Sequence, residues 1–218
     1  MGNTNHIGDT NACRAYIDKL ALFWTNHSQG KVVIGASAGG YENSRYWFEQ
    51  AGNAGLAERA SVGVSLAGVS PSDVVKQPLV SFATNVAGYF GGGIHANWPT
   101  TYPTDSSIVF VGSSSWYIMT TEESFNGLRF GEISPLSQGT FIGWFSDKAF
   151  GGTNFSNTPV GAIAYTDEPG RDRNDTMIFY GYWASGRLFS SAAWASRGGL
   201  SAPMFPHFQA VGDPFVRR

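Results

Sequence analysis

Cysteine is almost absent from this sequence, which argues against a disulfide-rich scaffold and against a structural zinc scaffold. The 218 residues include one cysteine, Cys13, which cannot form an internal disulfide. The four histidines, His6, His27, His95 and His207, are not spaced as pairs of metal ligands, and structural zinc sites rely on cysteine and histidine. We therefore expect no disulfide framework, no metal, no other cofactor, and synthesis in a reducing cytoplasm.

Charged residues are also scarce. Lys, Arg, Asp and Glu make up 14% of the chain, the net charge is −2, and the longest basic run is Arg217-Arg218. An average soluble protein has roughly 25% charged residues. Nucleic acid is not expected as the main partner, because phosphate binding depends on clustered cations. Low charge with many aromatic residues fits either a surface shared with partner subunits or simply a β-sandwich core.

Long apolar runs are missing as well. No stretch approaches the roughly 18 apolar residues that a membrane-spanning helix needs. The polar residues 1–11 lack the cationic start and apolar run of a signal peptide. The sequence therefore predicts no membrane span and no secretion leader.

Glycine and aromatic residues are abundant, with 28 glycines and 15% aromatics. Residues 113–145 hold three aromatic or β-branched runs, separated by turn chemistry such as Asn126-Gly127, at 116–118, 128–133 and 140–145. Further strands are predicted at 31–36, 61–69, 79–83, 108–111, 160–165, 177–183 and 187–194. This spacing, with Gly and Pro between the runs, favours a mainly β fold, an antiparallel sandwich or barrel-like sheet.

One helix is predicted near the start of the chain. Its apolar positions recur at helical spacing over residues 12–24 and follow N-cap candidates at Asp9, Thr10 and Asn11. We expect residues 1–30 to form a leader with this amphipathic helix. Residues 31–218 would form a single mainly β domain, with an irregular excursion rich in Pro and Gly near 71–103.

The strongest signal for catalysis is the segment Gly35-Ala36-Ser37-Ala38-Gly39, which matches the G-x-S-x-G pattern of a nucleophile elbow. In such a site Ser37 would be the nucleophile and the Ala38 amide would bind the oxyanion. His207 would then be the base, and Asp172 or Asp167 the acid that precedes it in the chain.

Three features argue against this hydrolase hypothesis. Only 34 residues precede the motif, which leaves no room for strands before it. The chain after residue 60 is predicted as short strands instead of alternating strands and helices. The small residues also fit a hairpin turn. We therefore predict no enzyme, with a serine hydrolase using Ser37, His207 and Asp172 as the alternative.

A third interpretation is a carbohydrate-binding β-sandwich that presents Trp98, Tyr102 or Trp183 to a glycan. Other candidates carry weaker signals. The acidic pairs Glu122-Glu123 and Asp167-Glu168 match glycosidase carboxylates only in residue type. The glycines at 91–93 lack the lysine of a phosphate-binding loop.

Four motifs occur in an order that is characteristic of one family. They are a glycine-rich segment that ends in Trp-Pro (91–99), I-V-F-V-G followed by W-Y-I (108–118), Phe130-Gly131-Glu132-Ile133, and a closing series of Gly199-Leu200, Pro203, His207 and Gly212-Asp213-Pro214-Phe215. This order resembles the minor virion structural proteins of tailed bacteriophages, over residues 91–215.

The resemblance implies a structural component of a phage virion, made in the host cytoplasm. The protein would be a minor tail or tail-tip protein, or lie on the head surface, and would assemble as a symmetric oligomer. Its partners would be copies of itself and other virion proteins, with a host glycan as a further contact. The resemblance implies no catalytic residues.

Overall fold

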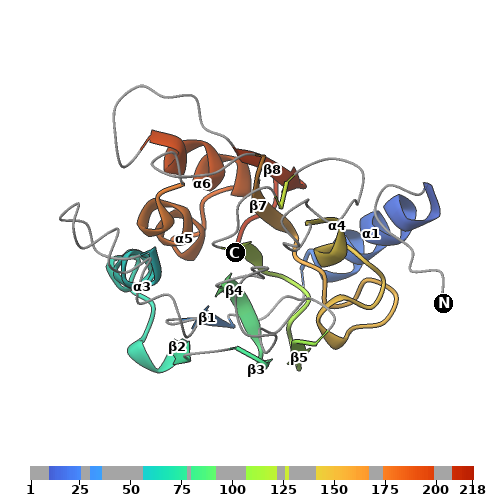
Figure 1. Cartoon of the computed structure of the whole chain (residues 1–218), viewed down its shortest axis with the longest axis horizontal. Coiled ribbons are helices and arrows are strands. Elements are labelled where there is room, and N and C mark those ends of the chain that lie inside the picture. Colours follow the sequence, from blue (N-terminus) through green and yellow to red (C-terminus); the bar gives the residue numbers. More distant parts are fainter. Residues whose placement is uncertain are drawn as a thin grey trace, which may run out of the picture.

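The computed structural model describes residues 10–25, 30–35, 56–77, 80–91, 107–121, 126–127, 141–166, 174–198 and 208–218. Its centre is a six-stranded sheet in the order β2-β1-β4-β6-β7-β8. Every neighbouring pair in this sheet is parallel except β7 and β8, which are antiparallel. Helices lie on both sides of the sheet (Figure 1).

The strands of the main sheet are β1 (Lys31–Gly35), β2 (Val74–Gln77), β4 (Val86–Gly91), β6 (Ile118–Thr121), β7 (Gly161–Tyr165) and β8 (Phe208–Gly212). A second, two-stranded parallel sheet contains β3 (Phe82–Thr84) and β5 (Val109–Val111). The helices are α1 (Thr10–Phe23), α3 (Leu56–Leu66), α4 (Phe141–Trp144), α5 (Thr176–Ala184) and α6 (Phe189–Ala195). Short 3-10 turns are η1 (Pro71–Asp73), η2 (Ala149–Gly151) and η3 (Ser196–Gly198).

The prediction of a mainly β, antiparallel sandwich or barrel-like fold is wrong, because the main sheet is mostly parallel and the chain is mixed α/β. Residues 61–69, 177–183 and 187–194, predicted as strands, contribute to α3, α5 and α6. Of the runs in 113–145, residues 140–145 contain α4, and 128–133 lie outside the described residues. The described part of 71–103 contains η1, β2, β3 and β4.

Helix α5 shows why the sequence pattern was misleading. It is buried along the helical positions Thr176, Phe179, Tyr180 and Trp183, while its sequence is almost wholly apolar. A helix that is apolar on every side has no polar stripe, so its short aromatic run looks like a buried strand. The helix begins where the Asp175 side chain accepts a hydrogen bond from the Met177 amide at 2.9 Å.

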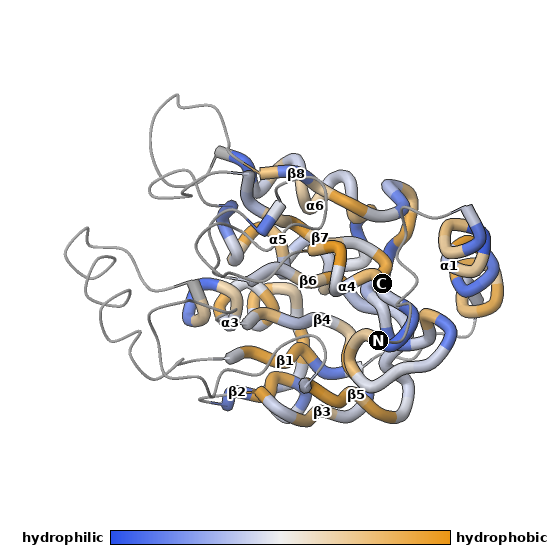
Figure 2. Tube along the Cα trace, turned by 45° about the vertical axis from the view of Figure 1, so that its right-hand side comes forward, coloured by the Kyte–Doolittle hydropathy of each residue, from blue (hydrophilic) through white to orange (hydrophobic). Residues whose placement is uncertain are grey.

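Other predictions from local pattern are confirmed. The helix predicted at 12–24 corresponds to α1, and the strands predicted at 31–36, 108–111 and 160–165 correspond to β1, β5 and β7. Every residue of β4, β6 and β7 is buried, as expected for parallel strands covered on both faces. Hydrophobic residues, drawn orange in Figure 2, run through the strands, whereas α1 carries both colours.

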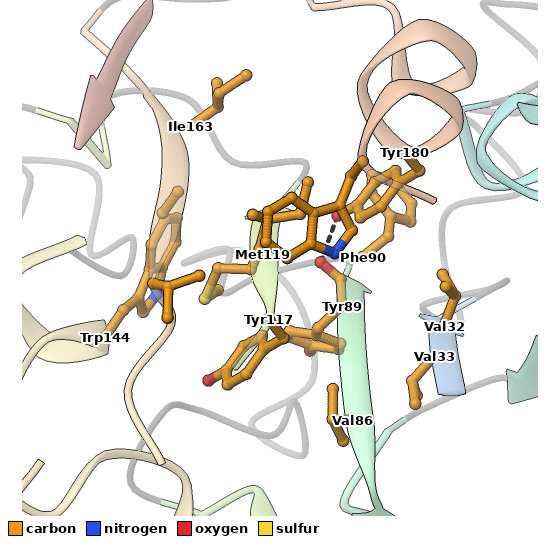
Figure 3. Packing of buried hydrophobic residues seen from close by; sticks show 14 of the residues in the cluster. Val32, Val33, Val86, Tyr89, Phe90, Tyr117, Met119, Trp144, Ile163 and Tyr180 are labelled. Atoms are coloured by element: carbon orange, nitrogen blue, oxygen red, sulfur yellow. Dashed lines mark hydrogen bonds between the residues drawn. The ribbon is translucent and has the colours of Figure 1, made fainter. Parts of the chain in front are cut away.

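Helices α3, α5 and α6 cover one face of the sheet, and α1 and α4 cover the other (Figure 1). On the first face Tyr180 reaches from α5 to β4, where its hydroxyl donates to the Tyr89 carbonyl (Figure 3). On the second face the Phe110 and Phe150 rings stack with centroids 4.9 Å apart, and the Tyr16 hydroxyl donates to the Val160 carbonyl at 2.8 Å. Within the described residues, no helix combines the length and hydrophobicity that crossing a bilayer requires.

Gly63→Ala tests the contact between α3 and α5. A β-carbon at Gly63 would overlap the Met177 carbonyl, and one at Gly181 would lie 3.0 Å from the Gly63 oxygen. We expect Gly63→Ala to lower the free energy of unfolding by about 2 kcal/mol, because overpacking against backbone exceeds the ~1 kcal/mol gain in helix propensity. Urea unfolding would measure this, with Ser65→Ala, an exposed position on α3, as the control. Equal stabilities of the two variants would contradict this packing.

Candidate functional site

The strand order reverses direction at β1, which marks a candidate site. In chain order, β2 is added on one side of β1 and β4 on the other. The next strand of the main sheet after β1 therefore lies on one side of it, and the next strand after β4 lies on the other side. In doubly wound α/β sheets, ligands bind outside the carboxyl ends of the strands at such a reversal. The carboxyl ends of β1 and β4 therefore form the candidate site.

Both of these strand ends are glycines in close backbone contact. An ideal β-carbon on Gly35 would lie 3.3 Å from the Phe90 carbonyl oxygen and 3.5 Å from the Gly91 Cα. The pairing of Ile34 with Phe90 places the two ends side by side. Gly35 is the first residue of the G-A-S-A-G motif, and Gly91 opens the segment G-G-G-I-H. Two glycine-rich segments therefore leave the sheet from adjacent positions.

The predicted catalytic residues Ser37, Asp172 and His207 lie outside the described residues, as do Asp167, Glu122, Glu123, His95, Trp98, Tyr102 and the segment Phe130-Gly131-Glu132-Ile133. The structure does describe the strand ends next to which they occur in the sequence. Tyr165 pairs with Phe208, so the chain leaves β7 and enters β8 at one point of the carboxyl edge. Strands β4 and β6 lie between β1 and β7. The distance from β1 to β7 is therefore about 14 Å, at ~4.8 Å per strand.

The suggestion that Trp183 presents its ring to a glycan is wrong. Trp183 is fully buried in α5, and its indole nitrogen donates to the Ala87 carbonyl at 2.7 Å. The ring packs against the sheet, where it contributes to the core. A buried indole usually needs such a partner, so this hydrogen bond accounts for the polar atom of the ring.

A cluster of buried polar side chains lies beneath the carboxyl edge, on the face covered by α5. The Tyr165 hydroxyl donates to Asn174 Oδ1, and the Thr120 amide donates to the Tyr180 hydroxyl at 3.2 Å. All four residues are fully buried. Burial raises the pKa of Tyr180 well above its ordinary value, so its hydroxyl stays protonated and donates to the Tyr89 carbonyl.

Two atoms of this cluster are not satisfied. In the described part of the chain, neither Thr120 Oγ1 nor Asn174 Nδ2 has a hydrogen-bond partner. An unpartnered buried polar atom is costly and is a place where a bound water or ligand is stabilised. The sequence pattern does not predict this cluster. Its one signal was Asn174-Asp175-Thr176, cap chemistry directly before an apolar run.

An ion pair next to the cluster ties the two helices together. Asp175 is 2% exposed and accepts from Arg59 Nε at 3.1 Å, while Arg59 Nη2 contacts its second oxygen. The same carboxylate caps α5 through Met177. Helices α3 and α5 follow β1 and β7 in the chain, so the pair joins their starts near the carboxyl edge. Because both carboxylate oxygens are occupied, Asp175 has a structural role.

No group of three His, Cys, Asp or Glu residues that could hold a metal ion occurs among the described residues.

Comparison with protein-family models, with curated proteins and with solved structures found no match. The resemblance to phage virion proteins therefore stays a prediction. A function for the chain has to rest on its own geometry.

Replacement of Asp175 tests this anchor of the site. We expect Asp175→Ala to lower the free energy of unfolding by about 3 kcal/mol, because it removes a helix cap worth ~1 kcal/mol and leaves Arg59 without its carboxylate. Chemical denaturation followed by circular dichroism would measure the loss. Asp18→Ala, at an exposed position of α1, should change stability by less than ~0.5 kcal/mol. A loss in Asp175→Ala as small as the control's would refute the anchoring role.

Proposed function

We propose that this protein binds a small acyl compound at the carboxyl edge of its sheet, between β1 and β4, and hydrolyses it with Ser37 as the nucleophile. The observation that supports this proposal is the position of Gly35. It is the first residue of the G-A-S-A-G motif and the last residue of β1, at the point where the strand order reverses. The motif thus begins where ligands bind in doubly wound α/β sheets.

The fold answers one of the objections to a hydrolase and weakens a second. Strands before the motif are not needed, because β2 and β4, which come later in the chain, flank β1 on both sides. Helices also separate some of the strands along the chain: α3 lies between β1 and β2, α4 between β6 and β7, and α5 and α6 between β7 and β8, whereas no helix of the described residues lies between β2 and β6. Strand–helix alternation of this kind is the architecture in which nucleophile elbows occur.

A nucleophilic serine needs a base within hydrogen-bond reach. His95 follows Gly91 by four residues, and β4 is the direct neighbour of β1. His207 precedes Phe208, which pairs with Tyr165 of β7. Strand β7 lies about 14 Å from β1, at ~4.8 Å per strand. His95 is therefore the base in this proposal, in place of His207. It would accept the serine proton as Oγ attacks the acyl carbon, and water would then release the acyl group.

A fluorophosphonate probe tests the nucleophile. We expect covalent labelling of the wild-type protein on Ser37, complete loss in Ser37→Ala, and a decrease of about 100-fold or more in the labelling rate of His95→Ala. Ser65→Ala, an exposed serine on α3, should label like the wild type. Labelling that persists in Ser37→Ala, or no labelling of the wild type, would rule out this hydrolase. A large loss in His207→Ala but not in His95→Ala would reassign the base.

A structural role in a phage virion is the second candidate, and one surface favours it. The two-stranded sheet turns Ala83 and Phe110 inward, while Phe82, Val109 and Val111 are 51%, 38% and 39% exposed on its outer face. Parallel strands are normally covered on both faces. A partly exposed apolar face of this kind suits contact with a neighbouring subunit. Strand β5 also carries the I-V-F-V-G motif of the resemblance.

Mass spectrometry of washed particles from cells that carry the gene tests this second candidate. The protein should be present at a fixed copy number set by particle symmetry. Phe82→Asp should reduce its incorporation, because a charge on the outer face would be buried at the contact. Ser81→Asp, at the exposed neighbouring position, is the matched control. Absence of the wild-type protein from the particles would exclude this role.

A further inference from the structure

Lys19 is a buried lysine without a counter-ion among the described residues. It lies on α1, on the face of the sheet opposite α5, and is 4% exposed. Its Nζ donates to Thr158 Oγ1 at 2.9 Å and to the Thr158 carbonyl. The Thr158 hydroxyl donates in turn to the Phe155 carbonyl at 2.9 Å, so its lone pairs are free to accept from the lysine.

The number of acceptors matches an uncharged amine. An ammonium group has three N–H donors, whereas a neutral amine has two donors and a lone pair. The described residues offer Lys19 two acceptors, both from Thr158, and no carboxylate. The Tyr16 ring lies 5.8 Å from Nζ, near the limit for a cation–π contact. Burial also lowers the pKa of Lys19 well below its ordinary value.

A groove lies beside this lysine. Its volume is about 490 Å³, and its lining includes Lys19 itself, the charged side chains of Arg14 and Asp18, and Ala15, Asn154 and Ser156. This volume falls within the range of small-molecule sites, and the mixture of apolar and polar walls is typical of them. Asn154 and Phe155 both have positive φ, at 50° and 63°, which is unusual for a bulky side chain such as phenylalanine. This backbone conformation positions the Phe155 carbonyl that holds the Thr158 hydroxyl.

We propose that Lys19 is a reactive amine that forms a Schiff base with a small aldehyde or ketone bound in the groove between α1 and residues 154–158. The Nζ lone pair attacks the carbonyl carbon and forms a C–N bond, and a proton moves from nitrogen to oxygen to give a carbinolamine. Loss of water then leaves an imine. The amine and the carbonyl compound are the only reactants, and no oxidant is needed.

This site is separate from the proposed hydrolase site. Thr158 precedes β7, whose first residue is Gly161, so the lysine is held at the amino end of that strand. The G-A-S-A-G motif starts at the carboxyl edge. Ser37→Ala should therefore leave the reactivity of Lys19 unchanged, and the failure of one proposal does not affect the other.

Reductive methylation of the full chain with formaldehyde and cyanoborohydride at neutral pH tests the proposal. Peptide mass spectrometry would follow the rate at each lysine. We expect Lys19 to react at least about tenfold faster than the exposed Lys76 and Lys148. Only the neutral amine reacts, and each unit by which the pKa of a lysine falls raises its neutral fraction at neutral pH about tenfold. A rate at Lys19 equal to or below that of the exposed lysines would overturn the proposal.

A variant that fills the groove tests whether the carbonyl compound reaches Lys19 through it. Ala15→Phe should slow methylation of Lys19 and leave Lys76 and Lys148 unaffected, because the ring occupies the space through which the carbonyl compound enters. Ala195→Phe, a half-buried position on α6, is the matched control and should not change the rate. Lys19 reactivity that is unchanged in a folded Ala15→Phe would show that the groove is not the binding site.

Discussion

Burial of the central strands on both faces is the constraint on which the rest of this structure depends. All residues of β4, β6 and β7 are buried, and these strands run parallel. A parallel sheet must be covered by other elements on each side, and each strand must be reached by a crossover. Helices α3, α5 and α6 meet the first requirement on one face, and α1 and α4 on the other. The close backbone contact at Gly63 then joins α3 to α5.

The same constraint separates the two proposed sites of the molecule. Because the crossovers all begin at the carboxyl ends of the strands, the segments that carry candidate nucleophiles and bases start from one edge, near Gly35 and Gly91. The amino end of β7 instead holds Thr158, which accepts the hydrogen bonds of Lys19. A serine-based reaction at one edge and an amine-based reaction at the other are compatible within one domain of this architecture.

The errors of the sequence analysis have a common physical origin. Residues 177–183 are almost wholly apolar around the helix, so no polar stripe shows the helical period. Residues 61–69 contain Gly63, which weakens a helix locally but is required where two backbones meet. In both segments tertiary packing outweighs local propensity. The G-x-S-x-G pattern at Gly35 is visible in the sequence, but the position of Gly35 at the reversal of strand order depends on partners far along the chain.

The sequence alone determined the features that depend on local periodicity: helix α1, strands β1, β5 and β7, and the absence of long apolar or basic runs. Tertiary structure decided which strands are neighbours, that they run parallel, and which polar groups are buried. Strand order arises from contacts between distant segments, as when Val32 pairs with both Val74 and Gly88. The lowered pKa of Lys19 likewise follows from its burial against Thr158, 139 residues away in the chain, and no local pattern could show it.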